Sequence, residues 1–283
     1  MASIQRQVKP SLGAPEKSIG DLFRLDGRTV IISGGGGSVG LEVARSVLES
    51  GGDVVCLDSQ AEPLPEPWDK VLQVAEQNDT KAWYHRCDVS SEEDLRRAFK
   101  QALSLTRFPL QGLVTCAGIS GKGPATEWPI DSLKRIMDIN FTGTFMCAQE
   151  AAREFQRKGV PGSMVLIASM SAHGSNKGVD TAAYNSSKSA VVQLARSLAA
   201  EWGSSKDYPL IRVNTVSPGY IRTRMTSPTM HAEGLEQQWS EDNMMMRVSS
   251  ADEHRGAIIF LLSDASSFVT GSDLRTDGGH TAW

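Results

Sequence analysis

The fold of this chain is decided by one stretch, Ser33-Gly34-Gly35-Gly36-Gly37-Ser38-Val39-Gly40. It lies between a short β-branched run, residues 28–33, and a segment of helical period, residues 38–50. Glycines at such a junction allow positive φ angles and the close approach of a pyrophosphate, whose charge the N-terminus of the following helix stabilises. We interpret the stretch as a phosphate-binding turn between a strand and a helix. A flexible glycine-rich loop is the alternative.

The same alternation of short and long segments continues along the chain. The predicted strands are 28–33, 53–58, 81–87, 112–116, 163–168, 211–216 and 273–276, and the predicted helices are 38–50, about 66–78, 91–106, 131–158, 181–203 and 251–263. Crossover helices that each bury an apolar stripe on the sheet give parallel strands covered on both faces. The sequence therefore predicts an α/β fold, a doubly wound Rossmann fold with a seven-stranded parallel sheet. We expect one domain over 25–283 and a flexible or loosely docked arm at 1–24.

The composition is that of an ordinary globular protein. The chain has 283 residues, of which 40% are hydrophobic and 22% charged, and a net charge of -4 without a basic stripe, so no nucleic-acid partner is expected. No apolar run approaches the roughly 18 residues of a membrane span, and residues 1–24 lack a signal-peptide core, so we expect a cytoplasmic protein without a membrane partner. Cys56, Cys87, Cys116 and Cys147 stand far apart and predict reduced thiols and no metal site.

The second predicted strand ends at Asp58, eighteen residues after Gly40. A carboxylate there can accept both ribose hydroxyl hydrogens of an adenosine and would repel a 2′-phosphate. Neither the glycine turn nor residues 59–61 contain Lys or Arg, which favours NAD(H) and leaves NADP(H) as the alternative. Asp88 and Val89, after the third predicted strand, are predicted to reach the adenine.

A candidate catalytic pair lies in the run Tyr184-Asn185-Ser186-Ser187-Lys188, inside the predicted helix 181–203. Residues four apart lie on one face of a helix, so both side chains can face one pocket. A phenol of pKa about 10 is a poor base at neutral pH, and a neighbouring cation lowers that pKa. Tyr184 is therefore a candidate general acid/base. Because the Tyr-x-x-x-Lys pattern alone is common by chance, two solvated helix residues are the alternative.

Two further stretches accompany this pair, Ile167-Ala168-Ser169-Met170-Ser171-Ala172-His173-Gly174 and Val213-Asn214-Thr215-Val216-Ser217-Pro218-Gly219-Tyr220-Ile221-Arg222-Thr223. In this order and spacing, behind the glycine turn, the chain resembles the short-chain dehydrogenase/reductase family in its single-domain form over about 25–283. The resemblance implies an NAD(P)-dependent oxidoreductase that interconverts a ketone and a secondary alcohol by hydride transfer.

The family's catalytic tetrad falls on Asn140, Ser171, Tyr184 and Lys188. The resemblance implies that Ser171 holds the substrate oxygen, Tyr184 passes the proton, and Lys188 binds the nicotinamide ribose and lowers the pKa of Tyr184. Asn140 would position a water that relays protons to bulk. Ser171 is preferred over Ser169, the alternative, because it lies thirteen residues before Tyr184.

The resemblance also implies a set of cofactor contacts along the chain. They are Gly34, Gly36, Gly37, Ser38, Val39, Gly40, Asp58, Asp88, Val89, Ala117, Gly118, Asn140, Tyr184, Lys188, Pro218, Gly219, Ile221 and Thr223. The turn at 218–219 would pass beneath the nicotinamide, with Ile221 and Thr223 near its carboxamide and the diphosphate. Two residues depart from the family pattern: Ser38 replaces a glycine and would crowd the pyrophosphate, and Cys116 replaces an asparagine whose hydrogen bonds it cannot make.

The substrate side is predicted to be a helical lid at about 224–248. Its methionines, among them Met225 and Met230, adapt to irregular apolar shapes, although a lid helix packed on the core is an equal interpretation. His173 is either a pocket neighbour or a plain loop residue.

Residues 167–171, 219–223 and 277–283 resemble fungal-type polyol and ketose reductases, which include arabinitol, mannitol and sorbose dehydrogenases. One alternative is a tailoring ketoreductase of secondary metabolism acting on a bulkier apolar ketone. Another is a cofactor-binding pseudoenzyme, sensor or scaffold repurposed for non-redox catalysis, against which the intact tetrad argues. Family analogy implies a small-molecule substrate and a homotetramer that pairs the helices 131–158 and 181–203.

Overall fold

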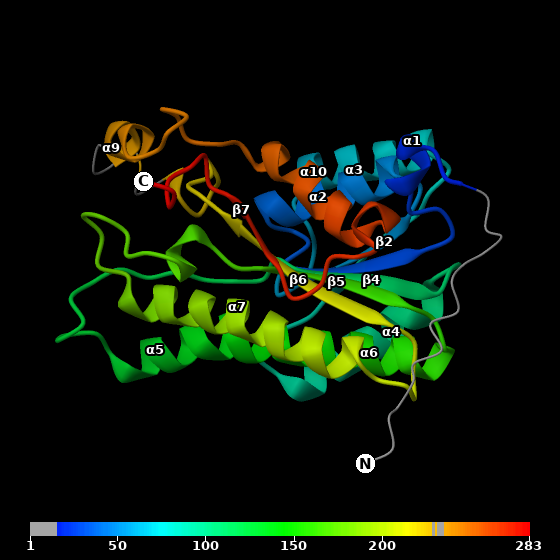
Figure 1. Ribbon diagram of the computed structural model, residues 1–283. Coiled ribbons are helices and arrows are strands. Elements are labelled where there is room, and N and C mark those ends of the chain that lie inside the picture. The colour runs from blue at the N-terminus through cyan, green and yellow to red at the C-terminus, as the bar shows by residue number, and fades with distance from the viewer. Residues whose placement is uncertain (1–15, 228–229, 231–234) are drawn as a thin grey trace, which may run out of the picture.

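The computed structural model describes residues 16–227, 230 and 235–283, and its centre is one parallel sheet (Figure 1). The strands are β1 (Thr29–Ser33), β2 (Asp53–Asp58), β3 (Ala82–Arg86), β4 (Leu110–Thr115), β5 (Gly162–Ile167), β6 (Ile211–Pro218) and β7 (Asp273–Thr276). They pair in the order β3-β2-β1-β4-β5-β6-β7, and every pairing is parallel. The predicted seven-stranded Rossmann sheet is confirmed. Its strand order reverses between β1 and β4, and ligands of such sheets bind at this point, beyond the carboxyl ends of the strands.

Helices cover both faces of the sheet (Figure 1). One face carries α2 (Ser38–Glu49), α3 (Pro65–Gln77) and α10 (Arg255–Leu262), and the other carries α4 (Glu92–Leu105), α5 (Ile130–Met137), α6 (Gly143–Lys158) and α7 (Ala182–Gly203). The two apolar cores between sheet and helices are separate, because alternate residues of the strands point to opposite faces: Ile31 and Val55 belong to one core, Val30 and Val54 to the other.

Two predicted helices are interrupted. The helix expected over 131–158 is divided into α5 and α6 by a π-helical turn, Asp138–Thr142, and the helix expected over 251–263 begins as a 3-10 turn, Ala251–His254. A π turn inserts one residue into a helix and leaves the apolar period on either side recognisable, so periodicity alone does not reveal it. Its central residue is Asn140, which lies in the predicted site.

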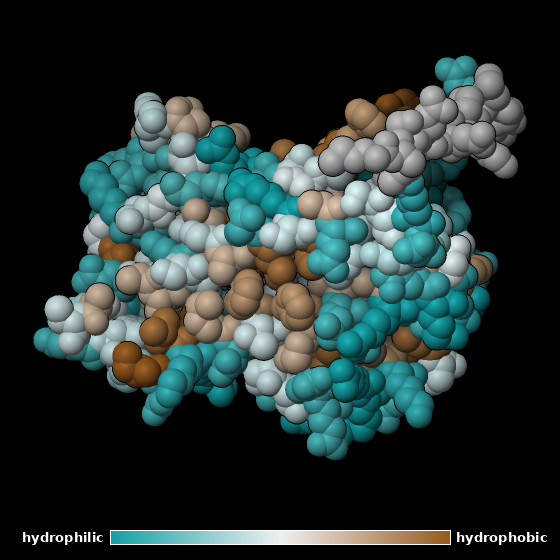
Figure 2. All heavy atoms as spheres, turned by 60° about the horizontal axis from the view of Figure 1, so that its bottom comes forward, coloured by the Kyte–Doolittle hydropathy of each residue, from teal (hydrophilic) through white to brown (hydrophobic). Residues whose placement is uncertain are grey.

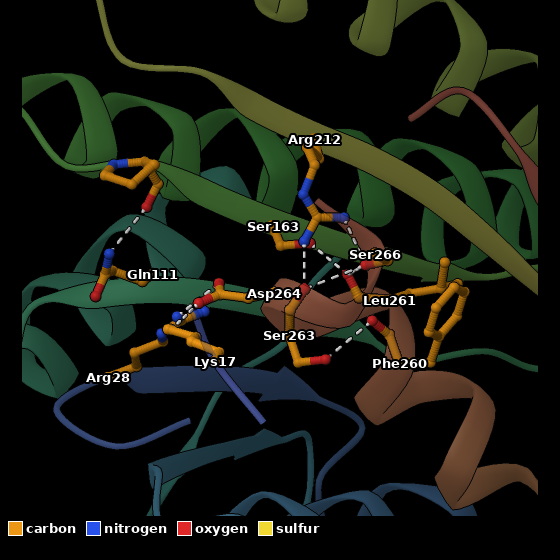
Figure 3. Close-up of polar contacts among 11 residues, drawn as sticks. Lys17, Arg28, Gln111, Ser163, Arg212, Phe260, Leu261, Ser263, Asp264 and Ser266 are labelled. Carbon is orange, nitrogen blue, oxygen red and sulfur yellow. Dashed lines mark hydrogen bonds and ion pairs between the residues drawn. The ribbon is translucent and has the colours of Figure 1, made fainter. Parts of the chain in front are cut away.

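The last helix is fastened to the sheet by a buried cation (Figure 3). Arg212 of β6 donates from Nη2 to the carbonyl oxygen of Ser263 at 2.9 Å, and from Nη1 to Ser266 Oγ at 2.8 Å and to the carbonyl oxygen of Val269 at 3.2 Å. Burial lowers the pKa of Arg212 to about 10. A guanidinium at the C-terminal end of α10 meets the carbonyl that this end leaves without an intrahelical partner.

The described part of the predicted arm is docked on the same region. Residues 19–22 form α1 (Ile19–Leu22), and Lys17 Nζ lies 2.5 Å from Asp264 Oδ2, beside the ion pair between Arg28 and Asp264 (Figure 3). Residues 1–15 lie outside the described residues. Residues 16–24 thus correspond to the docked alternative for the expected arm, because Asp264 forms ion pairs with Lys17 before α1 and with Arg28 after it.

The remaining expectations concern thiols, metals and membranes. The four cysteines are free, and burial raises the pKa of each thiol, that of Cys116 to about 12. Within residues 16–227, 230 and 235–283, no three or more His, Cys, Asp or Glu side chains are grouped as metal ligands. No helix in this part of the chain is long and apolar enough to cross a membrane.

Candidate active site

A cavity of about 980 Å³ opens at the carboxyl ends of the strands. Every residue predicted for the cofactor or for catalysis lines it, with the exception of Asn140. The glycine turn and Asp58 stand at one end, and Ser171, Tyr184 and Lys188 at the other.

The glycine turn has the shape that an anion requires. Gly34 has a φ of +67°, and a Cβ atom there would lie 2.5 Å from the backbone nitrogen of Ala117. A Cβ on Gly40 would overlap the carbonyl oxygen of Gly34. The N-cap of α2 is Gly37, and no side chain caps the helix, so its first N–H groups are available to a phosphate. The glycine turn and the start of α2 therefore fit the diphosphate of a dinucleotide. Ser38, which stands where the family pattern has a glycine, is the first residue of α2 and lines the cavity.

Asp58 is held in place by two backbone groups. Gly36 N–H donates to its Oδ2 at 2.9 Å, and Gln60 N–H donates to its Oδ1 at 3.2 Å. A Cβ on Gly36 would lie 3.1 Å from that Oδ2 and 3.3 Å from Tyr84 Oη. Tyr84 Oη donates to the carbonyl oxygen of Gln60 at 3.1 Å, and Gln60 is also the residue whose N–H binds Asp58. The Asp58 carboxylate and the Tyr84 phenol therefore line the same corner of the cavity. This corner fits a ribose hydroxyl pair.

The predicted adenine contact Asp88 accepts from Ser90 twice, from N–H at 3.0 Å and from Oγ at 2.6 Å. These hydrogen bonds hold the pKa of the Asp88 carboxyl below its usual value. Asp88 therefore presents a carboxylate to the cavity, which can accept the amino hydrogens of an adenine.

Tyr184 and Lys188 share one face of α7, as the spacing predicts. Lys188 is 5% exposed, and its Nζ donates to the carbonyl oxygen of Ile167 at 2.8 Å and lies 5.9 Å from the centre of the Tyr184 ring. Burial lowers the pKa of Lys188 to about 8. The alternative interpretation of Tyr184 and Lys188 as two solvated helix residues requires both side chains to be exposed to water. The Lys188 ammonium is instead buried, so this alternative does not hold.

The pKa of Tyr184 differs from the expectation. Burial raises it above its usual value, and a hydrogen bond with Ser169 opposes part of this rise. The expected lowering by Lys188 is therefore not what the structure shows. The physical reason is that removal from water penalises the phenolate, while the nearby ammonium is itself buried and directed to the carbonyl oxygen of Ile167.

The two candidate serines have different partners. Ser169 caps the 3-10 turn Met170–Ala172, accepting from Ser171 N–H at 3.1 Å, and it is the serine in contact with Tyr184. Ser171 Oγ donates to Asn176 Oδ1 at 2.8 Å. Asn176 lines the cavity and is absent from the sequence prediction, because the loop that carries it shows no periodic pattern.

Asn140 lies under the cavity and is fully buried. Its Oδ1 accepts from Ile119 N–H at 2.9 Å, and its Nδ2 donates to the carbonyl oxygen of Ile119 at 2.9 Å and to Ser187 Oγ at 3.0 Å. A Cβ added to Gly118 would lie 3.3 Å from Asn140 Oδ1. The side chain thus fastens the segment after β4 to α7.

His173 does not line the cavity. Its Nε2 lies 2.8 Å from Asp273 Oδ2 and 3.3 Å from Ser217 Oγ, and Ser217 Oγ donates to Asp273 Oδ1 at 2.7 Å. The interpretation of His173 as a pocket neighbour is therefore wrong. The buried carboxylate of β7 directs the imidazole away from the cavity and ties the serine turn to the end of β6.

An aromatic pair forms part of the lid side. The rings of Tyr220 and Trp239 stack with centroids 4.0 Å apart and planes 2° apart, and both line the cavity. Trp239 belongs to α9 (Leu235–Glu241), which confirms a helix within the predicted lid, and residues 228, 229 and 231–234 of that lid lie outside the described residues. Met225 lines the cavity, whereas Met230 is buried.

Comparison with known proteins agrees with this geometry. Residues 35–281 match a family model described as enoyl-(acyl carrier protein) reductase. A short-chain dehydrogenases/reductase of Aspergillus versicolor, notP', is 51% identical over 278 residues, which cover 98% of this chain and 95% of the relative. This chain belongs to the short-chain dehydrogenase/reductase family.

Other members of the short-chain dehydrogenase/reductase family are more distant. A D-arabinitol 2-dehydrogenase (ribulose-forming) of Candida tropicalis is 35% identical and covers 92% of this chain and 95% of its own length. The crystal structure of a short-chain type dehydrogenase/reductase from Mycobacterium marinum has a TM-score of 0.85 at 34% identity and covers 94% of this chain and 100% of its own. The protein is therefore an oxidoreductase that acts on CH–OH groups, and its family uses NAD or NADP.

Proposed function

We propose that this short-chain dehydrogenase/reductase interconverts a ketone and a secondary alcohol with Tyr184 as general acid/base and NAD(H) as the preferred cofactor. One observation carries the proposal. Tyr184 and Lys188 share the face of α7 that lines a single cavity, and the opposite end of the same cavity is formed by an uncapped helix N-terminus and Asp58.

A bound nicotinamide dinucleotide supplies the hydride in reduction and accepts it in oxidation. The protein's own part is the proton and the position of the substrate oxygen. Because burial raises its pKa, Tyr184 holds a proton at neutral pH and can donate it to a carbonyl oxygen. Ser171 and Ser169 offer hydroxyls beside that oxygen, and Lys188 offers an ammonium to a ribose hydroxyl. We propose Ser171 as the residue that holds the substrate oxygen, with Ser169 as the alternative.

The proposed proton path continues below the cavity. The π turn leaves Asn140 buried next to Ile119 and Ser187, close to α7. We propose that a water held at this turn passes protons between Lys188 and bulk solvent.

The preference for NAD(H) is argued from Asp58. Its carboxylate is fixed at the ribose corner by Gly36 and Gln60, where it accepts two ribose hydroxyls and repels a 2′-phosphate. Titration of the protein with NADH and with NADPH tests this preference. We expect tighter binding of NADH, and loss of the preference in Asp58→Ser. Equal affinities in the wild type would remove the argument.

For the substrate, we propose a polyol or ketose. The support is the relative named as a D-arabinitol 2-dehydrogenase, which matches over 92% of this chain. The half-buried ring of Tyr220, which lines the cavity and stacks on the buried Trp239, favours a second candidate, a bulkier apolar ketone of the kind that tailoring ketoreductases reduce, because an aromatic ring contributes apolar contact surface.

A panel of ketoses, polyols and bulky ketones tests these candidates. Turnover is followed by the absorbance of the reduced nicotinamide. Turnover of ketoses and polyols alone supports the first candidate, and turnover of bulky ketones alone supports the second. If nothing on the panel reacts although the cofactor binds, the alternative of a cofactor-binding sensor or a repurposed scaffold replaces both.

We further propose a homotetramer that pairs α5 to α7 across two-fold axes, on family analogy. Figure 2 shows this face of the molecule with hydrophobic side chains gathered between hydrophilic margins. Among the residues of these helices, Ile130 of α5 and Phe145 of α6 are exposed, 63% and 38% respectively, and association through this layer would cover such residues.

A further inference from the structure

Arg224 lines the cavity and has no part in the proposed chemistry. Its Nη2 lies 3.4 Å from the carbonyl oxygen of Gly36, to which it donates, 188 positions away in the sequence. Gly36 lies in the glycine turn and donates its N–H to Asp58. The lid segment therefore places the guanidinium of Arg224 at the glycine turn, residues 33–40, which itself contains no Lys or Arg.

The backbone that carries Arg224 is fixed on both sides. Arg222 N–H donates to the carbonyl oxygen of Ser249 at 2.8 Å, and Thr223 N–H donates to Thr226 Oγ1 at 3.0 Å. Thr226 Oγ1 in turn donates to the carbonyl oxygen of Ile221 at 2.5 Å. The direction of this segment over the glycine turn is thus set by hydrogen bonds to the end of β6 and to the residues before Ala251.

The arginines of the lid differ in their partners. Arg222 forms an ion pair with Glu236, and Arg247 forms one with Glu253. For Arg224 no carboxylate lies within 4.0 Å among residues 16–227, 230 and 235–283. A guanidinium presents parallel N–H donors that match the oxygens of a phosphate, and an arginine left without a carboxylate keeps these donors available.

We propose that Arg224 binds a phosphate group of the dinucleotide, opposite the N-terminus of α2. The proposal rests on the proposed function, because it requires a dinucleotide in the cavity. The diphosphate is the expected partner, since the carboxylate of Asp58 beside Gly36 repels a 2′-phosphate. Arg224 is then a cofactor-binding residue supplied by the lid. The affinity for either dinucleotide depends on Arg224 as well as on Asp58.

The test compares Arg224→Gln with Arg222→Gln. Both substitutions remove one positive charge from the same segment, but Arg222 faces Glu236. Dissociation constants of NADH and NADPH are measured by fluorescence titration for the wild type and both variants, together with the melting temperature of each without cofactor. We expect Arg224→Gln to weaken binding about tenfold or more at an unchanged melting temperature, and Arg222→Gln to change it less than about twofold.

The pattern of loss identifies the phosphate. An equal loss for NADH and NADPH supports the diphosphate, and a loss confined to NADPH supports the 2′-phosphate. Wild-type affinities in Arg224→Gln, or an equal loss in Arg222→Gln, would overturn the proposal while the proposed function stands. A wild-type protein that binds neither dinucleotide would overturn both.

Discussion

At the scale of single residues, burial governs the protonation of Tyr184 and Lys188, the proposed catalytic pair. It raises the pKa of Tyr184 and lowers that of Lys188 to about 8, so each group is driven toward its neutral form. Ser169 opposes the shift of Tyr184 through a hydrogen bond. The proposed acid is therefore protonated at neutral pH, in the form that donates to a carbonyl.

Tyr184→Phe tests the proton transfer. The substitution keeps the ring and removes the hydroxyl, so kcat is expected to fall on the order of 10²- to 10⁴-fold while the dissociation constant of the cofactor changes little. Steady-state kinetics and cofactor titration measure the two effects. The control is Tyr208→Phe, a tyrosine that packs against the core away from the cavity. Full turnover by Tyr184→Phe on every active substrate would refute the role.

Lys188→Met tests the buried ammonium through stability. Burial lowers the pKa of Lys188 from 10.5 to about 8, so between these pH values the folded chain binds fewer protons at Lys188 than the unfolded chain does. The free energy of unfolding therefore rises with pH in this range. Below about pH 8 the buried ammonium destabilises the folded chain by its full amount. The unfolding free energy of the wild type relative to Lys188→Met should rise by about 2 kcal/mol between about pH 7.5 and about pH 9.5. Urea unfolding at the two pH values measures it. A pH-independent difference would show that the ammonium is solvated.

At the scale of elements, tight backbone approaches position the site. The first turn of α2 passes so close to Gly34 that position 40 has no room for a side chain. The end of α10 is held on the sheet by Arg212 of β6 and by Ser163 of β5, whose Oγ donates to the carbonyl oxygen of Leu261 at 2.7 Å.

Gly40→Ala should therefore disrupt the glycine turn. The added methyl would overlap the carbonyl oxygen of Gly34, and we expect cofactor binding to weaken at least about tenfold and the melting temperature to fall. Calorimetric titration and thermal unfolding provide the measurements. Gly256→Ala in α10 is the matched control, because nothing lies within 4 Å of its added Cβ; it should stabilise by up to about 1 kcal/mol. Equal effects at both positions would contradict the steric argument.

Arg212→Met should destabilise the protein by about 2–4 kcal/mol, because the carbonyls of Ser263 and Val269 and the hydroxyl of Ser266 each lose one buried hydrogen bond. Urea unfolding measures the loss. Arg275→Met removes an exposed arginine from the next strand and should change stability by less than about 0.5 kcal/mol. A loss at Arg212 no larger than that of the control would mean that water replaces the guanidinium.

At the scale of the whole molecule, the outer surface of one helix layer can be tested as an interface between copies of the chain. The layer with α5, α6 and α7 exposes apolar side chains on the face shown in Figure 2, and the family analogy predicts association through it. Light scattering should give a mass four times that of one chain. Phe145→Glu on α6 should lower that mass, whereas Leu72→Glu on α3, on the opposite layer, should not. A monomeric wild type would end the proposal.

The amino-acid sequence alone predicts the alternation of strands and helices, the glycine turn, the position of Asp58 at the end of a strand, and the shared face of Tyr184 and Lys188. These features depend on periodicity and on spacings within a few residues, which the chain shows directly. Tyr184 and Lys188 are four positions apart, so helix geometry alone places both on one face.

Four features become visible only in the three-dimensional structure: the π turn at Asn140, the partners of the two serines, the contacts of His173, and the hydrogen bond from Arg224 to Gly36. Each depends on a contact between segments distant in the sequence, such as β7 with the serine turn or the lid with the glycine turn. The pKa directions depend on burial, which removes water from Tyr184 and Lys188 only when the sheet, α7 and the lid have packed together.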